Sequence, residues 1–200
     1  MKRYVVLTRE GVLTPSTTNA DIESIEHRGP TEFLPGAVEG LQKLSEKGFG
    51  VIVIADPARS TRKLSFRKER SGLLQRWQLE VALQRGRIER IYERPHELKN
   101  YSDRSTLTVH FLRQLLAMER LNPFETFFVS DRATDLEPAG TIGFSTILVR
   151  RTSFLQPSEG SAGPVTVSNL LEAATRILTR EANPLLRALT AVAPRLAWEE

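Results

Sequence analysis

The chain has 200 residues, of which 40% are hydrophobic, and this is enough for one sizeable core with a tail. Its formal net charge of +4 at pH 7 is mildly basic and bears only weakly on the choice of partner. Cysteine is absent, which excludes disulfides and thiolate metal sites. No apolar run reaches the roughly 18 residues of a membrane span, so we expect a cytoplasmic protein.

Short apolar runs alternate with amphipathic segments, a pattern typical of βαβ units around a parallel sheet. Residues 3–8 are predicted to form a buried first strand, and residues 51–54 a second. Between them, residues 35–47 are predicted to form a helix that opens with Pro-Gly and ends before a glycine. The polar, turn-rich residues 14–30 are expected to form a loop over the strand ends.

The same alternation continues through the middle of the chain. Three further strands are predicted at residues 88–92, 126–129 and 146–149. Helices are predicted at residues 65–84 and from a cap at Ser105 to Arg120, and an acidic turn at residues 131–137. Five strands with intervening helices predict a doubly wound α/β sheet, whose ligands bind beyond the carboxyl ends of the strands.

The last part of the chain differs in composition, and we expect three segments. Residues 1–155 form the α/β domain, residues 156–166 have the Gly, Ser and Pro content of a linker, and residues 167–200 form a helical extension. Ser168 is expected to cap the first helix of this extension, and Asn183-Pro184 to start a second. The extension either docks on its own sheet, which is the commoner outcome, or joins two copies into a homodimer.

Five short motifs occur in the order and spacing of one known superfamily. They lie at residues 7–13, 33–38, 48–49, 91–96 and 130–135. Together they resemble the haloacid-dehalogenase-like (HAD) superfamily, and within it the histidinol-phosphatase and D,D-heptose 1,7-bisphosphate phosphatase branch. The resemblance covers about residues 3–151. It implies a HAD-like Rossmannoid three-layer sandwich with a central parallel sheet of about five strands and no large cap domain.

The first strand of that family ends in Asp-x-Asp, where the first carboxylate attacks phosphorus and the second acts as general acid and base. Thr8 and Glu10 occupy these two catalytic positions here. A carboxylate is already anionic and forms an acyl-phosphate that water hydrolyses, whereas a threonine hydroxyl is neutral and needs a base. Glu10 retains acid and base chemistry, but its extra methylene misplaces the carboxylate by about 1 Å.

The groups that hold the phosphate in this family are also altered. Ala55 replaces the hydroxyl residue at the end of strand two, and Asp56 adds negative charge beside it. Arg62 is a candidate to bind an anion in a bidentate manner through its guanidinium. The family's lysine is missing, and Arg104 is the candidate replacement.

The fourth family motif is the best preserved, with Asp131 and Asp135 in place of its two carboxylates. In the family the first of these binds Mg²⁺. Glu10, Asp131 and Asp135 are therefore candidates for a weak Mg²⁺ site, because Mg²⁺ needs only one or two carboxylates with water and substrate phosphate. Alternatively, both aspartates only cap and orient the loop. The zinc loop of some heptose-bisphosphate phosphatases is expected to be absent, since only His96 of its ligands remains.

Three functions remain open at this point. The favoured one is a HAD-fold pseudoenzyme that binds a phosphorylated small molecule or a protein partner, because nucleophile, hydroxyl clamp and lysine are lost together. The second is a Mg²⁺-dependent phosphomonoester hydrolase that uses Glu10 and Asp131. The third is a nucleotide- or nucleic-acid-binding module, disfavoured because no aromatic residues interleave the basic cluster. That cluster comprises Arg59, Arg62, Lys63, Arg67, Lys68, Arg70 and Arg76.

Overall fold

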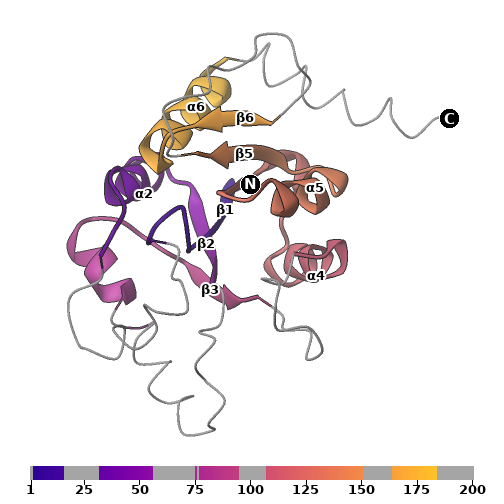
Figure 1. Ribbon diagram of the computed structural model, residues 1–200, viewed down its shortest axis with the longest axis horizontal. Coiled ribbons are helices and arrows are strands. Elements are labelled where there is room, and N and C mark those ends of the chain that lie inside the picture. Colours follow the sequence, from indigo (N-terminus) through magenta and orange to yellow (C-terminus); the bar gives the residue numbers. More distant parts are fainter. Residues whose placement is uncertain are drawn as a thin grey trace, which may run out of the picture.

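The computed structural model describes residues 2–15, 32–55, 75, 77–94, 107–150 and 164–183. Its centre is a six-stranded parallel sheet with helices on both faces (Figure 1). The strands are β1 (Tyr4–Thr8), β2 (Gly50–Ala55), β3 (Arg90–Glu93), β4 (Thr126–Ser130), β5 (Ser145–Val149) and β6 (Val165–Val167). The helices are α2 (Ala37–Glu46), α4 (Val109–Glu119), α5 (Ala133–Thr141) and α6 (Leu170–Ala182), with a 3₁₀ turn at Pro123–Glu125 and further helical residues at 77–83.

The strand order β3-β2-β1-β4-β5-β6 is that of a doubly wound sheet. Strands β2 and β3 extend the sheet to one side of β1, and β4 to β6 extend it to the other. The direction of winding therefore reverses between β1 and β4. Ligands of doubly wound sheets bind at such a reversal, beyond the carboxyl ends of the strands. Thr8 ends β1 and Ser130 ends β4, so these two residues mark the expected binding crevice.

Two hydrophobic clusters lie on opposite faces of the sheet and make the molecule a three-layer sandwich. One face packs α2, α6 and residues 77–83 against Val5 and Leu7. The other face packs α4 and α5 against Val6. Neighbouring residues of β1 thus point into different clusters, and each is fully buried. This explains why the strand is a continuous apolar run, as expected of a parallel strand covered on both sides.

The sheet has one strand more than the sequence predicts. Val165 and Thr166, which the composition placed in a linker, belong to β6, and β6 pairs in parallel with β5. Helix α6 follows and packs against α2, so the first helix of the C-terminal extension docks on its own chain. A β-carbon at Gly40 of α2 would lie 2.8 Å from the backbone carbonyl carbon of Leu170, so the two helices approach closely at this glycine.

Strands β1, β2, β4 and β5 and helix α2 form where the sequence predicts them, within two residues at each end. Helix α4 begins later than expected. Its N-cap is Thr108, whose Oγ1 accepts a hydrogen bond of 3.2 Å from the backbone N–H of Phe111. The residue predicted as the cap, Ser105, lies outside the described residues. The acidic turn predicted at residues 131–137 is in large part the first turns of α5.

Helix α6 is capped by Asn169 rather than by the predicted Ser168. Asn169 Oδ1 accepts from the backbone N–H of Glu172 at 2.9 Å, and the Glu172 carboxylate accepts in return from the backbone N–H of Ser168 at 2.9 Å. These bonds satisfy backbone donors at the helix start from both sides, as a capping box does. The hydrogen bond from the Ser168 backbone N–H to the Glu172 carboxylate also lowers the pKa of Glu172 below its ordinary value. None of the described helices is long and apolar enough to cross a membrane.

Candidate functional site

A tight turn follows β1 and fixes the first pair of site residues. The backbone N–H of Arg9 donates to Ile54 of β2 at 2.9 Å, and Arg9 accepts from the backbone N–H of Leu13 at 2.8 Å. Gly11 lies between them with a φ of 79°, a left-handed conformation that favours glycine. Leu13 is fully buried and anchors the far side of the turn in the core. Thr8 and Glu10 are therefore held in fixed positions at the carboxyl edge of the sheet.

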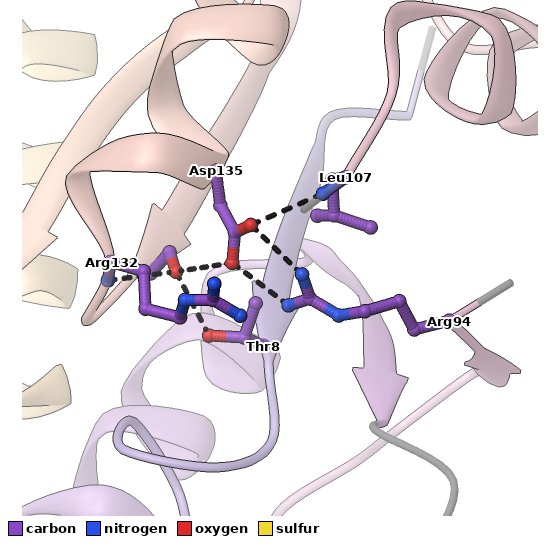
Figure 2. A network of polar contacts seen from close by, with 6 residues as sticks. Thr8, Arg94, Leu107, Arg132 and Asp135 are labelled. Atoms are coloured by element: carbon purple, nitrogen blue, oxygen red, sulfur yellow. Dashed lines mark hydrogen bonds and ion pairs between the residues drawn. The ribbon is translucent and has the colours of Figure 1, made fainter. Parts of the chain in front are cut away.

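Thr8 is turned into the protein, with 2% of its surface exposed. Its Oγ1 donates to Ser130 Oγ at 3.3 Å, and Ser130 Oγ donates in turn to Asp135 Oδ2 at 3.3 Å. Both contacts are longer than the usual 2.7–2.8 Å or so of an O–H···O bond, so each is weak. Figure 2 shows these side chains as one row that begins at the end of β1 and ends at the carboxylate in α5.

Asp135 is the centre of the polar network. Its Oδ1 and Oδ2 accept from Arg94 Nη1 and Nη2, each at 2.8 Å, and the two side chains are 0% and 3% exposed. Charge-assisted bonds of this paired geometry are the strongest that two side chains commonly form. Because both oxygens of the carboxylate face the guanidinium, the position of Asp135 is determined by Arg94.

The same carboxylate connects three segments of the chain. Arg94 follows β3, and its backbone N–H donates to Ala55 of β2 at 2.9 Å. The backbone N–H of Leu107, just before α4, donates to Asp135 Oδ1 at 3.3 Å (Figure 2). Arg94 and Leu107 border residues 95–106, so both ends of this segment are tied to one side chain.

Glu10 lies at the same edge of the sheet and is 8% exposed. Its Oε1 accepts from Arg9 Nε at 2.7 Å and also pairs with the Nη2 of that guanidinium. The Arg9 side chain is 26% exposed, so this ion pair lies nearer to solvent than the pair formed by Asp135. Two of the acidic residues at the site thus each face an arginine.

Asp131 follows β4 and lies directly against the turn after β1. A β-carbon built on Gly11 would be 1.9 Å from Asp131 Oδ2 and 2.1 Å from its Cγ, distances at which no side chain fits. Glycine is therefore favoured at this position by its φ, and any side chain there would have to displace the aspartate. The next residue, Arg132, donates its backbone N–H to Ser130 Oγ at 3.1 Å, and Figure 2 shows its side chain extending toward Thr8.

The structure brings together four of the residues that the sequence proposed for a site. Thr8, Glu10, Asp131 and Asp135 all lie at the carboxyl edge of β1 and β4. The remaining candidates, together with His96 and the basic cluster, lie outside the described residues. Those candidates are Asp56, Arg62 and Arg104.

Arg94 is a functional candidate that sequence patterns do not single out. In the sequence it stands two residues before His96, in the place of a zinc-binding motif. The available signal was its position, because an arginine directly after a strand points to the edge where the carboxylates converge. Without the structure, nothing indicated which carboxylate it would meet.

The charged groups bear directly on whether this arrangement fits a Mg²⁺ ion. Within the described ranges, no group of three or more acidic or histidine side chains is arranged to hold a metal. Mg²⁺ requires oxygen ligands in near-octahedral geometry. Here both oxygens of Asp135 face Arg94, and one oxygen of Glu10 faces Arg9. The described side chains therefore do not fit a Mg²⁺ site as they are placed.

Comparison with known proteins gives a clear result for the fold. No family model and no curated protein matches the sequence. A solved D,D-heptose 1,7-bisphosphate phosphatase from B. bronchiseptica, complexed with magnesium and phosphate, is similar with a TM-score of 0.70 and 18% identity, over 90% of this chain and 99% of that one. Its counterpart from Burkholderia thailandensis gives 0.56 and 23%, over 89% and 99%.

A third solved structure carries the name of the superfamily. This protein from Mesorhizobium loti is named as a HAD-like phosphatase, and it is similar with a TM-score of 0.63 and 13% identity, over 88% of this chain and 86% of that one. At these identities the likeness establishes the architecture of the chain and leaves its chemistry to the site. The protein has the haloacid-dehalogenase-like fold, as the order of its sequence motifs predicts.

Proposed function

We propose that this chain is a HAD-fold binding or regulatory protein that has lost phosphohydrolase activity. The proposal rests on the burial and hydrogen bonding of Thr8. In the position of the attacking carboxylate stands a hydroxyl that is 2% exposed and hydrogen-bonded to Ser130. A group so placed is neither anionic nor directed at a ligand, and both properties are needed for attack on phosphorus.

The surrounding network offers Thr8 no effective base. The carboxylate at the end of the row, Asp135, is two hydrogen bonds away from Thr8. It could accept a proton only by giving up charge-assisted bonds to Arg94. Activation of a threonine requires a base in direct hydrogen-bond reach, which this arrangement does not provide.

The alternative is a slow phosphatase in which Glu10 and Asp131 activate a metal-bound water. Its support is the fold shared with a phosphatase complexed with magnesium and phosphate, and the position of both carboxylates at one sheet edge. Catalytic groups that act as a unit lose orders of magnitude when one is removed. We therefore expect no turnover by this route.

The test is phosphate release from a panel of sugar phosphates and an aryl phosphate in the presence of Mg²⁺. The native chain is expected to release phosphate no faster than the protein-free reaction. Thr8→Asp restores a carboxylate, and Thr8→Asn is its matched control because the shape is the same and the charge is absent. Turnover by the native chain that Glu10→Gln abolishes would contradict the proposal and establish the slow phosphatase.

The binding half of the proposal needs a separate measurement. Calorimetric titration of the native chain with the same sugar phosphates and with inorganic phosphate reports binding without any requirement for turnover. Saturable binding of a phosphorylated compound supports a small-molecule ligand. If none of them binds, the remaining form of the proposal is a protein partner.

A further inference from the structure

We propose that the site at the carboxyl ends of β1 and β4 is independent of metal, because Arg9 and Arg94 supply the positive charge that a Mg²⁺ ion would otherwise supply there. This goes beyond the loss of turnover. A site with threonine at position 8 could still bind Mg²⁺ through its other carboxylates and remain inactive. Metal binding and turnover are therefore separate properties, and they can be tested separately.

Asp135 is already held by a counter-charge. Each of its oxygens lies 2.8 Å from a nitrogen of Arg94, and the pair is almost completely buried. The guanidinium is permanently charged, and its planar fork matches the carboxylate. A metal could take these oxygens only by displacing Arg94, which would deprive a buried guanidinium of this carboxylate. Such a separation is strongly unfavourable for a buried charge.

Glu10, which follows the end of β1, also has an arginine as its counter-charge. The carboxylate is 8% exposed and accepts from Arg9 Nε at 2.7 Å. Taken together, Glu10 and Asp135 carry two negative charges, and Arg9 and Arg94 carry two positive charges. The two pairs are neutral without any bound ion, so Glu10 and Asp135 together exert little net electrostatic attraction on a divalent cation.

Thr8 and Asp131 are the other two sequence candidates that the structure places at this edge. Thr8 contributes a neutral hydroxyl, and that hydroxyl donates to Ser130. Asp131 remains as the third acidic residue, beside the turn at Gly11. One carboxylate can hold Mg²⁺ only together with waters and the phosphates of a bound substrate. A Mg²⁺ ion alone therefore has no sufficient set of ligands among the described side chains.

The proposal is tested by thermal unfolding of the native chain in MgCl₂ and in NaCl of equal ionic strength. The two midpoints are expected to agree. A site with a Kd one hundredfold below the Mg²⁺ concentration would raise the midpoint by about 5–10 °C in a domain of this size. A Mg²⁺-specific increase of that order that Asp131→Asn removes would overturn the proposal.

A second variant tests the role of the guanidinium itself. Arg94→Gln deprives Asp135 of this counter-charge, so its midpoint is expected to fall and then to recover in part with Mg²⁺ but not with NaCl. Arg87→Gln is the matched control, because the Arg87 side chain is 74% exposed and pairs with Glu89 only at 4.0 Å. A folded Arg94→Gln variant with no response to Mg²⁺ would contradict the proposal. If that variant does not fold, the native titration alone decides.

The outcome is distinguishable from failure of the proposed function. Specific Mg²⁺ binding by the native chain without phosphate release would overturn the metal-independent site and leave the loss of activity intact. Phosphate release in the presence of a chelator that removes Mg²⁺ would contradict the loss of activity and leave the metal-independent site intact.

Discussion

The sheet carries an ion pair at each of its two ends, and the pairs are built differently. At the carboxyl end, Arg94 and Asp135 form two bonds of 2.8 Å and are 3% and 0% exposed. At the amino end, Arg3 Nη1 lies 2.5 Å from Glu181 Oε2, and these side chains are 33% and 10% exposed. Each pair joins segments that are far apart in the sequence.

The environment of the two pairs differs even more than their exposure. At the amino end the arginines also lie over aromatic rings: Arg3 is 4.6 Å from the ring centre of Phe49, and Arg180 is 5.1 Å from that of Phe127. Burial lowers the pKa of the Arg180 guanidinium below its ordinary value, and the nearby Glu181 acts in the opposite direction. Charge here assists the packing of α6 against the sheet.

At the carboxyl end the neighbours of the pair are hydroxyls and backbone N–H groups, including those of Ser130 and Leu107. Replacement of a buried ion pair by apolar residues of similar volume is often neutral or stabilising, so such a pair is weak evidence for stability. The charges at the amino end therefore help to attach α6, whereas those at the carboxyl end lie at the sheet edge where doubly wound sheets bind their ligands.

The sharpest test of this contrast is to break the buried pair. Arg94→Met and Asp135→Leu should each reduce the free energy of unfolding by about 3–5 kcal/mol, because each removes one partner from a buried charge. The double variant should be far less destabilised than the sum of the two. Urea denaturation of all four proteins measures the coupling. Additive effects would mean that the two side chains are not energetically paired, and the contrast between the ends would then fail.

The second test concerns the turn that holds Asp131 at the carboxyl end. Gly11 and Gly48 have nearly equal φ values of 79° and 76°. A β-carbon at Gly11 would collide with the Asp131 carboxylate, whereas one at Gly48 would meet nothing within 4 Å. Both alanine variants should lose the roughly 1–2 kcal/mol that a left-handed backbone costs a non-glycine residue.

Gly11→Ala should lose about 1–3 kcal/mol more than Gly48→Ala, since its methyl group must displace the Asp131 carboxylate. Urea denaturation of the two variants measures the difference. Adding Asp131→Ala to the Gly11→Ala variant should recover most of this additional loss. Equal losses for the two glycines would show that Asp131 moves away at no cost, and hence that this part of the crevice is loosely held.

The smallest effect is expected at the amino end. The coupling between Arg3→Ala and Glu181→Ala should be about 0.2–1 kcal/mol, the usual range for a partly exposed pair, and it should shrink as salt is added. A double-variant cycle in low and high NaCl measures it. A coupling as large and as insensitive to salt as that of Arg94 and Asp135 would remove the distinction between the two ends.

Sequence patterns predicted the central strands well because these strands are covered on both faces, and burial on both faces leaves a continuous apolar run. They did not predict β6. Its three residues follow a stretch rich in glycine, serine and proline, and two of the three are exposed. What makes them a strand is the pairing with β5, which is a tertiary contact and leaves little trace in local sequence.

The difference between local sequence patterns and tertiary contacts also applies to the site. Thr8, Glu10 and Asp131 could be placed together from the sequence, because each follows or ends a strand and the carboxyl ends of parallel strands share one edge. The pairing of Arg94 with Asp135 could not, since it joins residues 41 positions apart through the orientation of two side chains. That Arg94 and Asp135 are partners is visible only in the three-dimensional structure.

Arg94 and Leu107, the two described residues on either side of positions 95–106, are both bound to the carboxylate of Asp135. Where the ends of a segment are fixed by the rest of the protein, a doubling of its length costs only about 0.6 kcal/mol in closure entropy. The fold can therefore accept sequences of varied length and character at this point. Insertions and deletions between positions 94 and 107 could therefore leave both attachment points at Asp135 unchanged.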